Sequence, residues 1–217
     1  MKTNRPRGMW GFISGGGTYQ EDKFAHDAQA LTSYFRHKGY VFAQVGQPQI
    51  EPLQDSADGK TRWVRLRIPV DERDRYRVKS IAVSGNQNLP TPAILSVLNK
   101  VKVGDYYQDK PIRKGYEKLR EFYGAAGFMD FTMLPEVTPN NRDGVTGEPI
   151  AGFTGQPEVD LVFKIEEGTR YFLNRLTFAG NTTTRDTVIR REMRLVEGGV
   201  FNMESLKFSI RRLKQLG

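Results

Sequence analysis

The sequence has no cysteine and only two histidines among its 217 residues. Without cysteine, the chain has no disulfide framework, no thiolate zinc site and no cysteine nucleophile. It also lacks any run of 18 apolar residues, so we expect no transmembrane helix. His26 and His37 lie on one predicted helix, and no carboxylate pattern nearby completes a ligand set. We therefore expect no metal ion and no cofactor.

Negative charge is also scarce relative to positive charge. The chain has 33 Lys and Arg against 25 Asp and Glu, a net charge of +8, and residues 169–217 hold ten basic and four acidic residues. The basic cluster comprises Arg185, Arg190, Arg191, Arg194, Arg211, Arg212 and Lys214. Nucleic-acid-binding sheets interleave such residues with surface aromatics, whereas the aromatics here fall on the apolar positions of predicted strands and helices. We expect no nucleic acid, and a basic nucleic-acid-binding α/β module remains the alternative of another class.

The chain contains an internal repeat. Residues 66–86 and 161–181 align without a gap at an offset of 95 residues. The identical pairs are Leu66/Leu161, Glu72/Glu167, Arg75/Arg170, Tyr76/Tyr171, Gly85/Gly180 and Asn86/Asn181. In both copies apolar residues alternate, which predicts a half-buried strand, then a turn and a second strand. We assign the Gly-Asn pair that ends each copy to a structural turn, because both residues tolerate positive φ.

Helical signals follow each Gly-Asn pair. Thr91 and Pro92 predict an N-cap followed by proline at the first helical position, and Thr183 with Asp186 is similar to a capping box. A second helix, with apolar residues at helical spacing, is predicted in three sections. Its seams are Phe24–Phe35, Ile112–Tyr123 and Leu206–Leu213. In the first two sections a further strand follows, over Tyr40–Ile50 and Phe128–Val137.

These elements define a β-α-α-β-β unit of the α+β class, present in one complete and two partial copies. We predict a partial unit at residues 1–74, a complete unit at 75–168 and a truncated unit at 169–217. The long loop from Thr138 to Pro157 reads as a hairpin extension rather than a domain linker.

The same repetition argues against an enzyme. Asp71–Glu72 and Glu166–Glu167 look like paired acid–base carboxylates, but they recur at the same turn in both copies. The glycine run at 15–17 lacks the Gly-Lys-Ser/Thr ending of a phosphate-binding loop. We therefore expect no catalytic residues.

The repeated phrases resemble the POTRA (polypeptide-transport-associated) repeats of BamA-like outer-membrane protein assembly factors. The resemblance rests on Tyr76–Asn86, Glu167–Asn181, Val188–Arg194, Ser209–Gly217 and Gly17–Phe24. It implies part of a third repeat, a whole fourth and part of a fifth. It also implies that each repeat is a three-stranded mixed sheet covered on one face by two antiparallel helices.

The resemblance implies a docking arm on the periplasmic side of the bacterial outer membrane, followed by a C-terminal barrel. Such an arm binds unfolded outer-membrane proteins by β-augmentation, and it binds accessory outer-membrane lipoproteins. An arm of a TamA-like or two-partner-secretion transporter is the nearest alternative. The basic 169–217 segment also suits an anionic membrane surface.

The resemblance further suggests particular residues. Lipoprotein contact points to Arg190, Arg194 and Glu197, although a solvated charged helix face explains these residues equally well. The client-binding edge strands carry Val41, Ala43, Val45, Met129, Phe131 and Met133, and a plain edge strand protected by Pro48 and Pro135 is the alternative. The structural turns carry Gly85, Asn86, Gly180 and Asn181.

Overall fold

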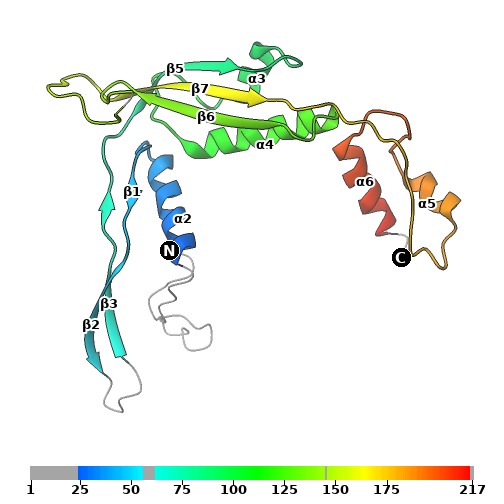
Figure 1. The fold of residues 1–217 in the computed structure, drawn as a ribbon, viewed down its shortest axis with the longest axis horizontal. Helices are drawn as coiled ribbons and strands as arrows, with labels where there is room; N and C mark the ends of the chain where they lie inside the picture. Colours follow the sequence, from blue (N-terminus) through cyan, green and yellow to red (C-terminus); the bar gives the residue numbers. More distant parts are fainter. Residues whose placement is uncertain (1–23, 56–61, 145, 216–217) are drawn as a thin grey trace. The chain divides into compact units, whose positions relative to one another are not determined.

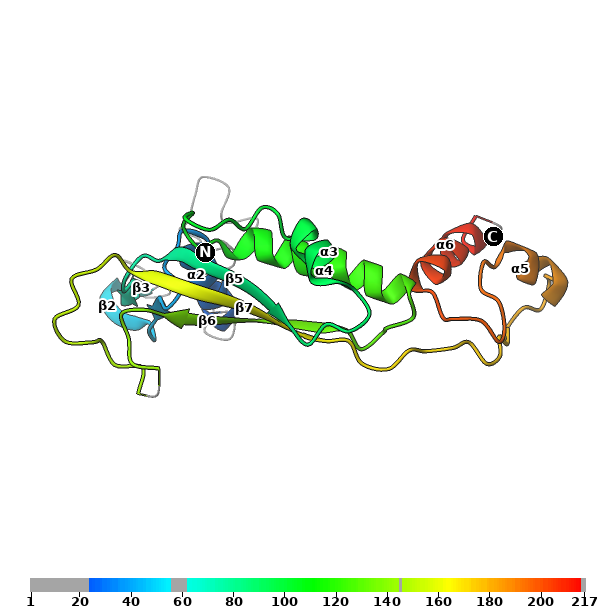
Figure 2. The same ribbon diagram turned by 90° about the horizontal axis from the view of Figure 1, so that it is seen from above.

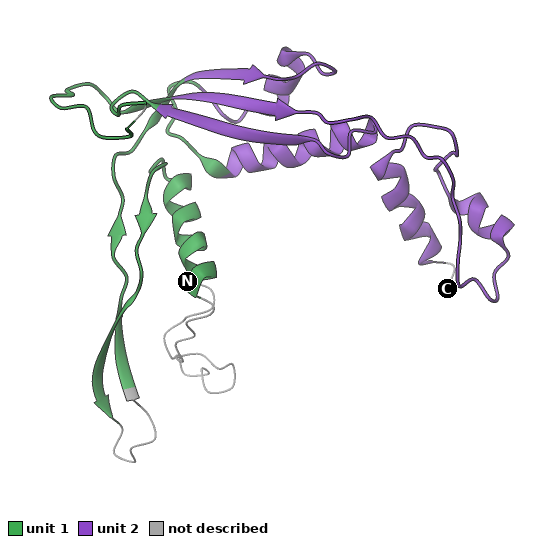
Figure 3. Cartoon of the chain, viewed as in Figure 1, with its two compact units in different colours: residues 1–79, 103–109, 139–159 green, residues 80–102, 110–138, 160–217 purple. Residues whose placement is uncertain are grey.

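The computed structural model describes residues 24–55, 62–144 and 146–215, so the expectations about the glycine run at 15–17 and the motif at 17–23 lie outside the described residues. The chain divides into two compact units (Figure 3). Unit 1 comprises Met1–Lys79, Val103–Asp109 and Pro139–Val159. Unit 2 comprises Ser80–Lys102, Lys110–Thr138 and Asp160–Gly217.

The described residues of unit 1 contain one helix and two antiparallel strand pairs. Helix α2 spans Phe24–His37, strand β1 (Gln44–Val45) pairs with β4 (Val70–Asp71), and β2 (Gln49–Asp55) pairs with β3 (Arg62–Arg67). The α2 helix follows from its apolar residues at helical spacing and from the basic residues in its last turn, which complement the helix dipole.

The strand predicted from Tyr40 begins only at Gln44. The preceding residues form a turn, in which the Ala43 amide donates to the Tyr40 carbonyl at 3.2 Å. Val41 and Ala43 are buried in this turn. Their apolar alternation therefore reflects packing of a turn, which sequence periodicity does not separate from a strand.

The complete predicted unit forms a three-stranded sheet in the order β5-β7-β6. Strand β5 spans Arg77–Ser84, β6 Thr132–Pro139 and β7 Glu158–Glu166. Figure 1 shows β5 and β7 running in the same direction and β6 in the opposite one, so the sheet is mixed. Helices α3 (Thr91–Val97) and α4 (Asp109–Ala125) lie on one face of it (Figure 2). The predicted fold class is thereby confirmed.

Alternating residues of the central strand build the core of this sheet. Val159, Leu161, Phe163 and Ile165 on β7 are all at most 4% exposed. From α4, the ring of Tyr123 stacks on Phe131 with 4.3 Å between ring centroids. Each such buried side chain stabilises the fold by roughly 1.5–3 kcal/mol relative to an exposed one. The apolar residues that alternate in the sequence therefore form the core face of the sheet.

Glycine sets the contact between helices α3 and α4 of unit 2. A Cβ at Gly115 of α4 would overlap the Leu98 side chain at the end of α3. Leu98 and Gly115 are both buried. The sequence therefore needs glycine in mid-helix here, despite its cost of about 1 kcal/mol relative to alanine.

The long loop between β6 and β7 is a hairpin extension, as predicted. The Asn140 amide donates to the Glu158 carbonyl at 2.9 Å, and its Oδ1 accepts from the Glu158 amide at 2.8 Å. Further along, the Tyr76 hydroxyl donates to Asn141 Oδ1 at 2.9 Å inside unit 1. These bonds hold the loop base without a separate core.

The 169–217 segment contains helices α5 (Asp186–Glu192) and α6 (Met203–Leu213). The strand predicted through Leu173, Leu176 and Phe178 does not form, and Phe172 makes only an isolated bridge to Val200. Among the described residues, no strand pairs along this stretch. A strand needs a partner for its backbone groups, so an alternating pattern alone does not produce one.

The predicted helix starts were also shifted. Helix α5 begins at Asp186 with Arg185 as N-cap, and no side chain makes the capping bond expected of Thr183. Helix α3 is likewise preceded by Pro90, so Thr91 is already helical. Both starts lie at a residue in extended conformation with φ −66° and ψ 143°. In both helices the preceding extended backbone defines the start without a side-chain cap.

The seam predicted for α6 is wrong at Ile210, whereas Leu206 and Leu213 are half-buried as expected. Ser209 is fully buried, whereas Ile210 is 43% exposed. The Ser209 hydroxyl accepts from the Arg194 amide at 2.9 Å and donates to the Ser205 carbonyl at 2.7 Å. Satisfied hydrogen bonds allow this polar side chain to be buried.

Within the described ranges, every helix is too short or too polar to traverse a bilayer.

Candidate binding surfaces

Strand β6 is one edge of the three-stranded sheet. The Asn140 amide points at β7, because it donates to Glu158. Alternate residues of a strand direct their N–H groups to the same side. The amides of 138, 136, 134 and 132 therefore face β7, and those of Met133 and Val137 face outward. Pro135 and Pro139 occupy the other outward positions, where a missing N–H costs no ladder bond.

Strand β5 is the other edge, and its beginning is covered. The Val78 amide donates to the Asp105 carbonyl at 2.9 Å, and the Val78 carbonyl accepts from the Gly104 amide at 2.8 Å. In unit 2 the same alternation turns the amides of Ser80, Ala82 and Ser84 outward. No proline interrupts them. The two edges thus differ, since β5 presents a continuous row of donors and β6 an interrupted one.

The side chains named as edge candidates contribute to packing rather than to an exposed surface. The strand predicted from Phe128 begins only at Thr132, so Met129, half-buried, and Phe131, 2% exposed, precede β6, and Met133 on β6 is 5% exposed. Val41 and Ala43 are buried outside any strand, and Val45 lies half-buried on β1. Strand addition at β6 would therefore use the main chain and not these side chains.

The structure brings Arg190 and Glu197 together. The Arg190 guanidinium donates to Glu197 Oε1 at 3.1 Å, to Asp186 Oδ2 at 2.7 Å and to the Leu176 carbonyl at 2.8 Å. Glu197 Oε1 also accepts from the Leu176 amide at 2.7 Å. We call Arg190, Glu197, Asp186 and Leu176 the α5 brace, because it ties α5 to the chain before it.

The α5 brace perturbs the titration of its members. The hydrogen bond from the Leu176 amide, followed by the one from Arg190, lowers the pKa of Glu197. The hydrogen bonds to Asp186 and then to Glu197 raise the pKa of Arg190. Both side chains stay about 40% exposed, at 42% and 41%. The pair is therefore locked in its ionised form and remains reachable from solvent.

Arg194 is not part of this brace. Its guanidinium carbon lies 3.4 Å from the centroid of the Phe208 ring, on α6. A cation over an aromatic face contributes roughly 0.5–1 kcal/mol at an exposed site. Arg194 therefore packs α6 against the chain just after α5 and makes none of the hydrogen bonds of the α5 brace.

A buried carboxylate holds the turn at Gly85 and Asn86. Glu167 is 7% exposed, and its oxygens accept from the Gln87 amide at 2.9 Å, the Asn88 amide at 3.0 Å and the Tyr123 hydroxyl at 2.7 Å. The Asn88 side chain donates to it as well. Sequence reasoning treated this glutamate as a turn residue only, although its identity with Glu72 in the repeat was the available signal.

These hydrogen bonds decide the charge state of the carboxylate. Burial raises the pKa of Glu167, but the bonds from the Asn88 side chain, the Gln87 amide, the Tyr123 hydroxyl and the Asn88 amide outweigh it, and the net pKa is lowered. Burial, with the Glu167 hydrogen bond and charge, raises the pKa of Tyr123. Glu167 is therefore an ionised structural cap and not a poised acid or base.

The matched turn residues adopt the geometry that their composition favours. Gly85 and Gly180 have φ of 84° and 82°. The Asn86 side-chain amide donates to the Leu89 carbonyl at 2.8 Å, and that of Asn181 donates to the Thr184 carbonyl at 3.1 Å.

The described residues contain no His, Asp and Glu group that could hold a metal ion.

Taken together, the described residues contain one small α+β unit, a mixed three-stranded sheet with a helix pair on one face, and further helices and strand pairs before and after it in the sequence. The family model of POTRA, described as surface antigen variable number repeat, matches residues 7–73, 76–168 and 171–217. The chain belongs to this POTRA family.

Relatives and solved structures agree with this assignment. The outer membrane protein assembly factor BamA of Neisseria meningitidis serogroup B is 26% identical over 210 residues, covering 97% of this chain and 24% of the relative. BamA of Nitratidesulfovibrio vulgaris is 26% identical over 215 residues, covering 96% and 24%. The crystal structure of Haemophilus influenzae BamA POTRA3-5 has a TM-score of 0.66 at 22% identity, covering 93% of this chain and 72% of that one.

The chain thus spans about a quarter of the length of these curated relatives. The relatives are described as assembly factors and not as enzymes. BamA-like POTRA repeats lie on the periplasmic side of the bacterial outer membrane, and this chain is placed there with them.

Proposed function

We propose that this chain is part of the periplasmic arm of an outer-membrane β-barrel assembly factor, and that it docks extended segments of unfolded outer-membrane proteins by strand addition. The observation that carries the proposal is the pair of open sheet edges, with outward amides at Met133 and Val137 on β6 and at Ser80, Ala82 and Ser84 on β5. Main-chain hydrogen bonds demand little of the client sequence, which suits many clients. The curated relatives favour a BamA-like arm over that of a TamA-like or two-partner-secretion transporter.

In this role the chain comprises three repeats, at 1–74, 75–168 and 169–217. In the whole protein a membrane-inserted barrel follows them. Accessory lipoproteins would dock on the α5 brace, where Arg190 and Glu197 stay accessible, and at Arg194. The basic excess of residues 169–217 supports a position near an anionic membrane surface. A nucleic-acid role is less well supported, because the sheet aromatics such as Phe131 and Phe163 are buried.

Proline substitutions at outward amides test strand addition directly. A fluorescent ten-residue peptide of alternating apolar and polar residues serves as the probe, and its anisotropy on the 217-residue chain reports binding. We expect Val137→Pro or Ala82→Pro to weaken binding severalfold, because each removes an outward donor without breaking a ladder bond. The affected variant identifies which edge the peptide uses.

Matched threonine variants distinguish the loss of a backbone N–H from the loss of the original side chain. Val137→Thr and Ala82→Thr keep the N–H and a residue suited to strands, so they should bind like the unaltered chain. Strand addition is wrong if neither proline variant loses affinity, or if the threonine variants lose as much as the proline ones. Urea denaturation of each variant shows whether it is folded.

A further inference from the structure

Two places in the chain share the same backbone hydrogen bonds. At the first junction, in unit 1, the Gly39 carbonyl accepts from the Tyr76 amide at 2.9 Å, and the Lys38 carbonyl accepts from Arg75 Nε at 2.7 Å. The Tyr76 carbonyl accepts from the Tyr107 amide at 3.0 Å. Three hydrogen bonds thus join separate segments of the chain around Tyr76.

The second junction, in unit 2, repeats each of these bonds. The Gly127 carbonyl accepts from the Tyr171 amide at 2.9 Å, and the Ala126 carbonyl accepts from Arg170 Nε at 3.0 Å. The Tyr171 carbonyl accepts from the Phe201 amide at 2.9 Å. Arg75 and Arg170 therefore have the same structural task.

At one facing pair of residues the chemistry differs between the two junctions. Arg77 faces Tyr106 across an isolated bridge in the first junction, and Phe172 faces Val200 across the matching bridge in the second. The backbone arrangement forms with either pair. Junction formation therefore does not explain why arginine and tyrosine occupy the first.

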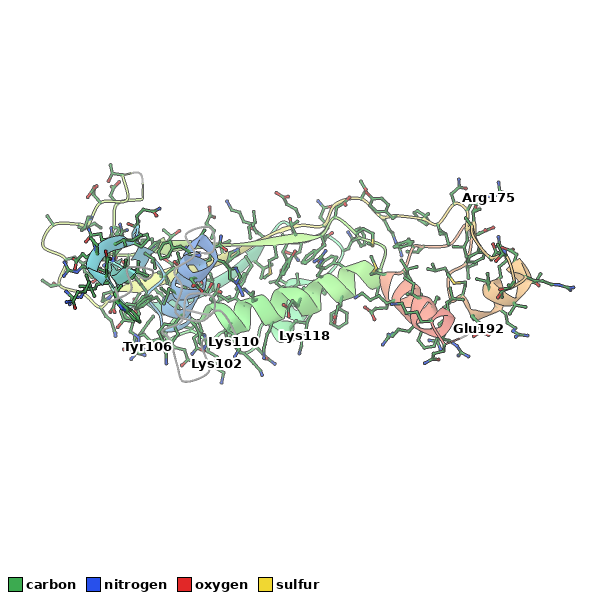
Figure 4. All side chains as sticks on the ribbon, turned by 90° about the horizontal axis from the view of Figure 1, so that it is seen from below. Lys102, Tyr106, Lys110, Lys118, Arg175 and Glu192 are labelled. Carbon is green, nitrogen blue, oxygen red and sulfur yellow. The ribbon has the colours of Figure 1, made fainter. Side chains whose placement is uncertain are left out.

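Arg77 and Tyr106 instead complete a cationic cluster. The guanidinium carbons of Arg75 and Arg77 lie 3.5 Å and 4.2 Å from the centroid of the Tyr106 ring. The Arg77 Nη1 donates to the Gly104 carbonyl at 2.6 Å. Tyr106 is labelled in Figure 4. Both guanidiniums are thus held by stacking and by one carbonyl each, before any ligand arrives.

The cluster lines a hollow of about 370 Å³. Its lining residues are His37, Lys38, Arg75, Arg77, Tyr106, Asp105 and Gln108. Three permanent cations face one carboxylate there, and in the described part of the chain neither guanidinium has an ion pair. Positive charge therefore exceeds negative charge in a hollow of small-ligand size.

We infer that the Arg75–Tyr106–Arg77 hollow is a binding site for a phosphate group. Guanidinium forks bind phosphate oxygens through paired charged hydrogen bonds, and the converging cations match a group with up to two negative charges. Tyr106 and the imidazole of His37 are the aromatic side chains of the lining, and no aliphatic residue joins them, so a polar phosphate-bearing group fits better than an apolar peptide anchor. The phosphate belongs either to an anionic lipid headgroup or to a free phosphate compound.

An NMR titration of the ¹⁵N-labelled 217-residue chain with inorganic phosphate, at constant ionic strength, tests the site. We expect shifts at the amides of Arg77 and Tyr106. The double variant Arg77→Phe/Tyr106→Val gives the first junction the side chains of the second, so it should keep the backbone bonds. It should bind phosphate about tenfold more weakly, because charged hydrogen bonds are lost.

Arg211→Gln is the matched control, since it also removes one charge, from exposed α6. Pelleting with phosphatidic acid vesicles distinguishes a lipid headgroup from a free phosphate compound as the source of the phosphate. Binding that the double variant loses assigns a lipid headgroup, and phosphate shifts without vesicle binding assign a free compound. If the double variant does not fold, Arg77→Gln replaces it.

Three results would overturn the inference. The first is a phosphate titration that leaves the Arg77 and Tyr106 amides unmoved. The second is an Arg211→Gln variant that weakens binding as much as the hollow variant does. The third is a glutamate-rich peptide that produces the shifts when phosphate does not, which would assign the hollow to an acidic polypeptide.

Discussion

Gly85 and Gly180 occupy matching turns with nearly equal positive φ, yet their surroundings differ. A Cβ at Gly85 would overlap the carbonyl oxygen of Ile165, whereas a Cβ at Gly180 meets nothing within 4 Å. Gly180→Ala should cost only the left-handed strain, about 1 kcal/mol. Gly85→Ala adds a backbone collision and should cost about 3 kcal/mol or more. Urea unfolding of both variants measures the difference, and equal losses would show that φ alone matters.

Glu167 makes stability depend on pH in a predictable direction. Its pKa is lower in the folded chain than its ordinary value of 4.5. The carboxylate therefore contributes stability above that ordinary value, and the contribution is lost as pH falls through the folded pKa. Glu167→Gln should lose about 2 kcal/mol of unfolding free energy at pH 7. The gap to the unaltered chain should shrink in more acidic solution.

Glu166→Gln is the control for this prediction. Glu166 precedes Glu167, is exposed and makes one weak contact, from the Thr132 hydroxyl at 3.5 Å. The same charge change there should leave stability nearly unaltered, within about 0.5 kcal/mol. Denaturant unfolding across the acid range measures both variants. A pH-independent loss in Glu167→Gln would contradict an ionised cap.

At the scale of elements, the two sides of β6 should respond differently to proline. The Thr138 amide faces β7 and the Val137 amide faces outward, by alternation from Asn140. Thr138→Pro removes a ladder bond and should cost about 3 kcal/mol. Val137→Pro should cost under about 1 kcal/mol, because Pro135 already occupies an equivalent position. Thermal melting of both variants tests the register, and a reversed order would show that the strand is shifted by one residue.

The α5 brace holds a short helix that has no side-chain N-cap. Arg190→Glu places like charges beside Asp186 and Glu197 and should destabilise the 169–217 segment. The double exchange Arg190→Glu/Glu197→Arg restores one ion pair but leaves Asp186 beside a glutamate, so it should recover part of the loss. Hydrogen exchange of the α5 amides is the measurement. Protection in Arg190→Glu equal to that in the unaltered chain would show that the brace does not hold the helix.

The same elements show how far sequence reasoning reaches. The periodicity of β7 and α4 predicted both their type and their buried residues, because those elements pack on a core whose period is their own. The stretch through Leu173 has the same alternation, but its backbone bonds only to the turn at Gly198 and Gly199 and makes a single bridge at Phe172, so its pattern does not become a strand. Strand formation depends on pairing, which a local pattern does not encode.

The candidate surfaces were less predictable than the fold. Arg190 and Glu197 were chosen together as one helical face and do meet, but for another reason: α5 ends at Glu192, and Glu197 lies in the turn beyond it. Arg194 was grouped with them, but its stacking on Phe208 depends on how α6 folds back. Arg75 and Tyr106 are 31 residues apart in the sequence. A contact at that separation, outside any helical or strand period, follows only from the tertiary fold.

For the whole molecule, the same backbone junction recurs once inside unit 1 and once inside unit 2. In repeat proteins each unit contacts mainly its neighbours, so stability is a sum of unit and interface contributions. Both junctions rely on a glycine with positive φ, 100° at Gly39 and 95° at Gly127. These glycines offer their carbonyls to the incoming tyrosine amides of Tyr76 and Tyr171. The junction is therefore built from backbone, which leaves its side chains free to diverge.

Alanine at the two junction glycines should have unequal effects. A Cβ at Gly127 would lie 2.7 Å from Val200 Cγ1 and 3.1 Å from the Tyr171 carbonyl, whereas one at Gly39 would meet the flexible Arg75 side chain at 3.1 Å. Gly127→Ala should therefore loosen the chain around Arg170 while the sheet core stays folded. Trypsin cleavage after Arg170 should accelerate about tenfold or more, since a weakening of 1.4 kcal/mol raises the open population by that factor. Gly39→Ala is the matched control and should leave that cleavage rate unaltered. A faster cut after Arg170 in both variants would mean that the two junctions are not independent of each other.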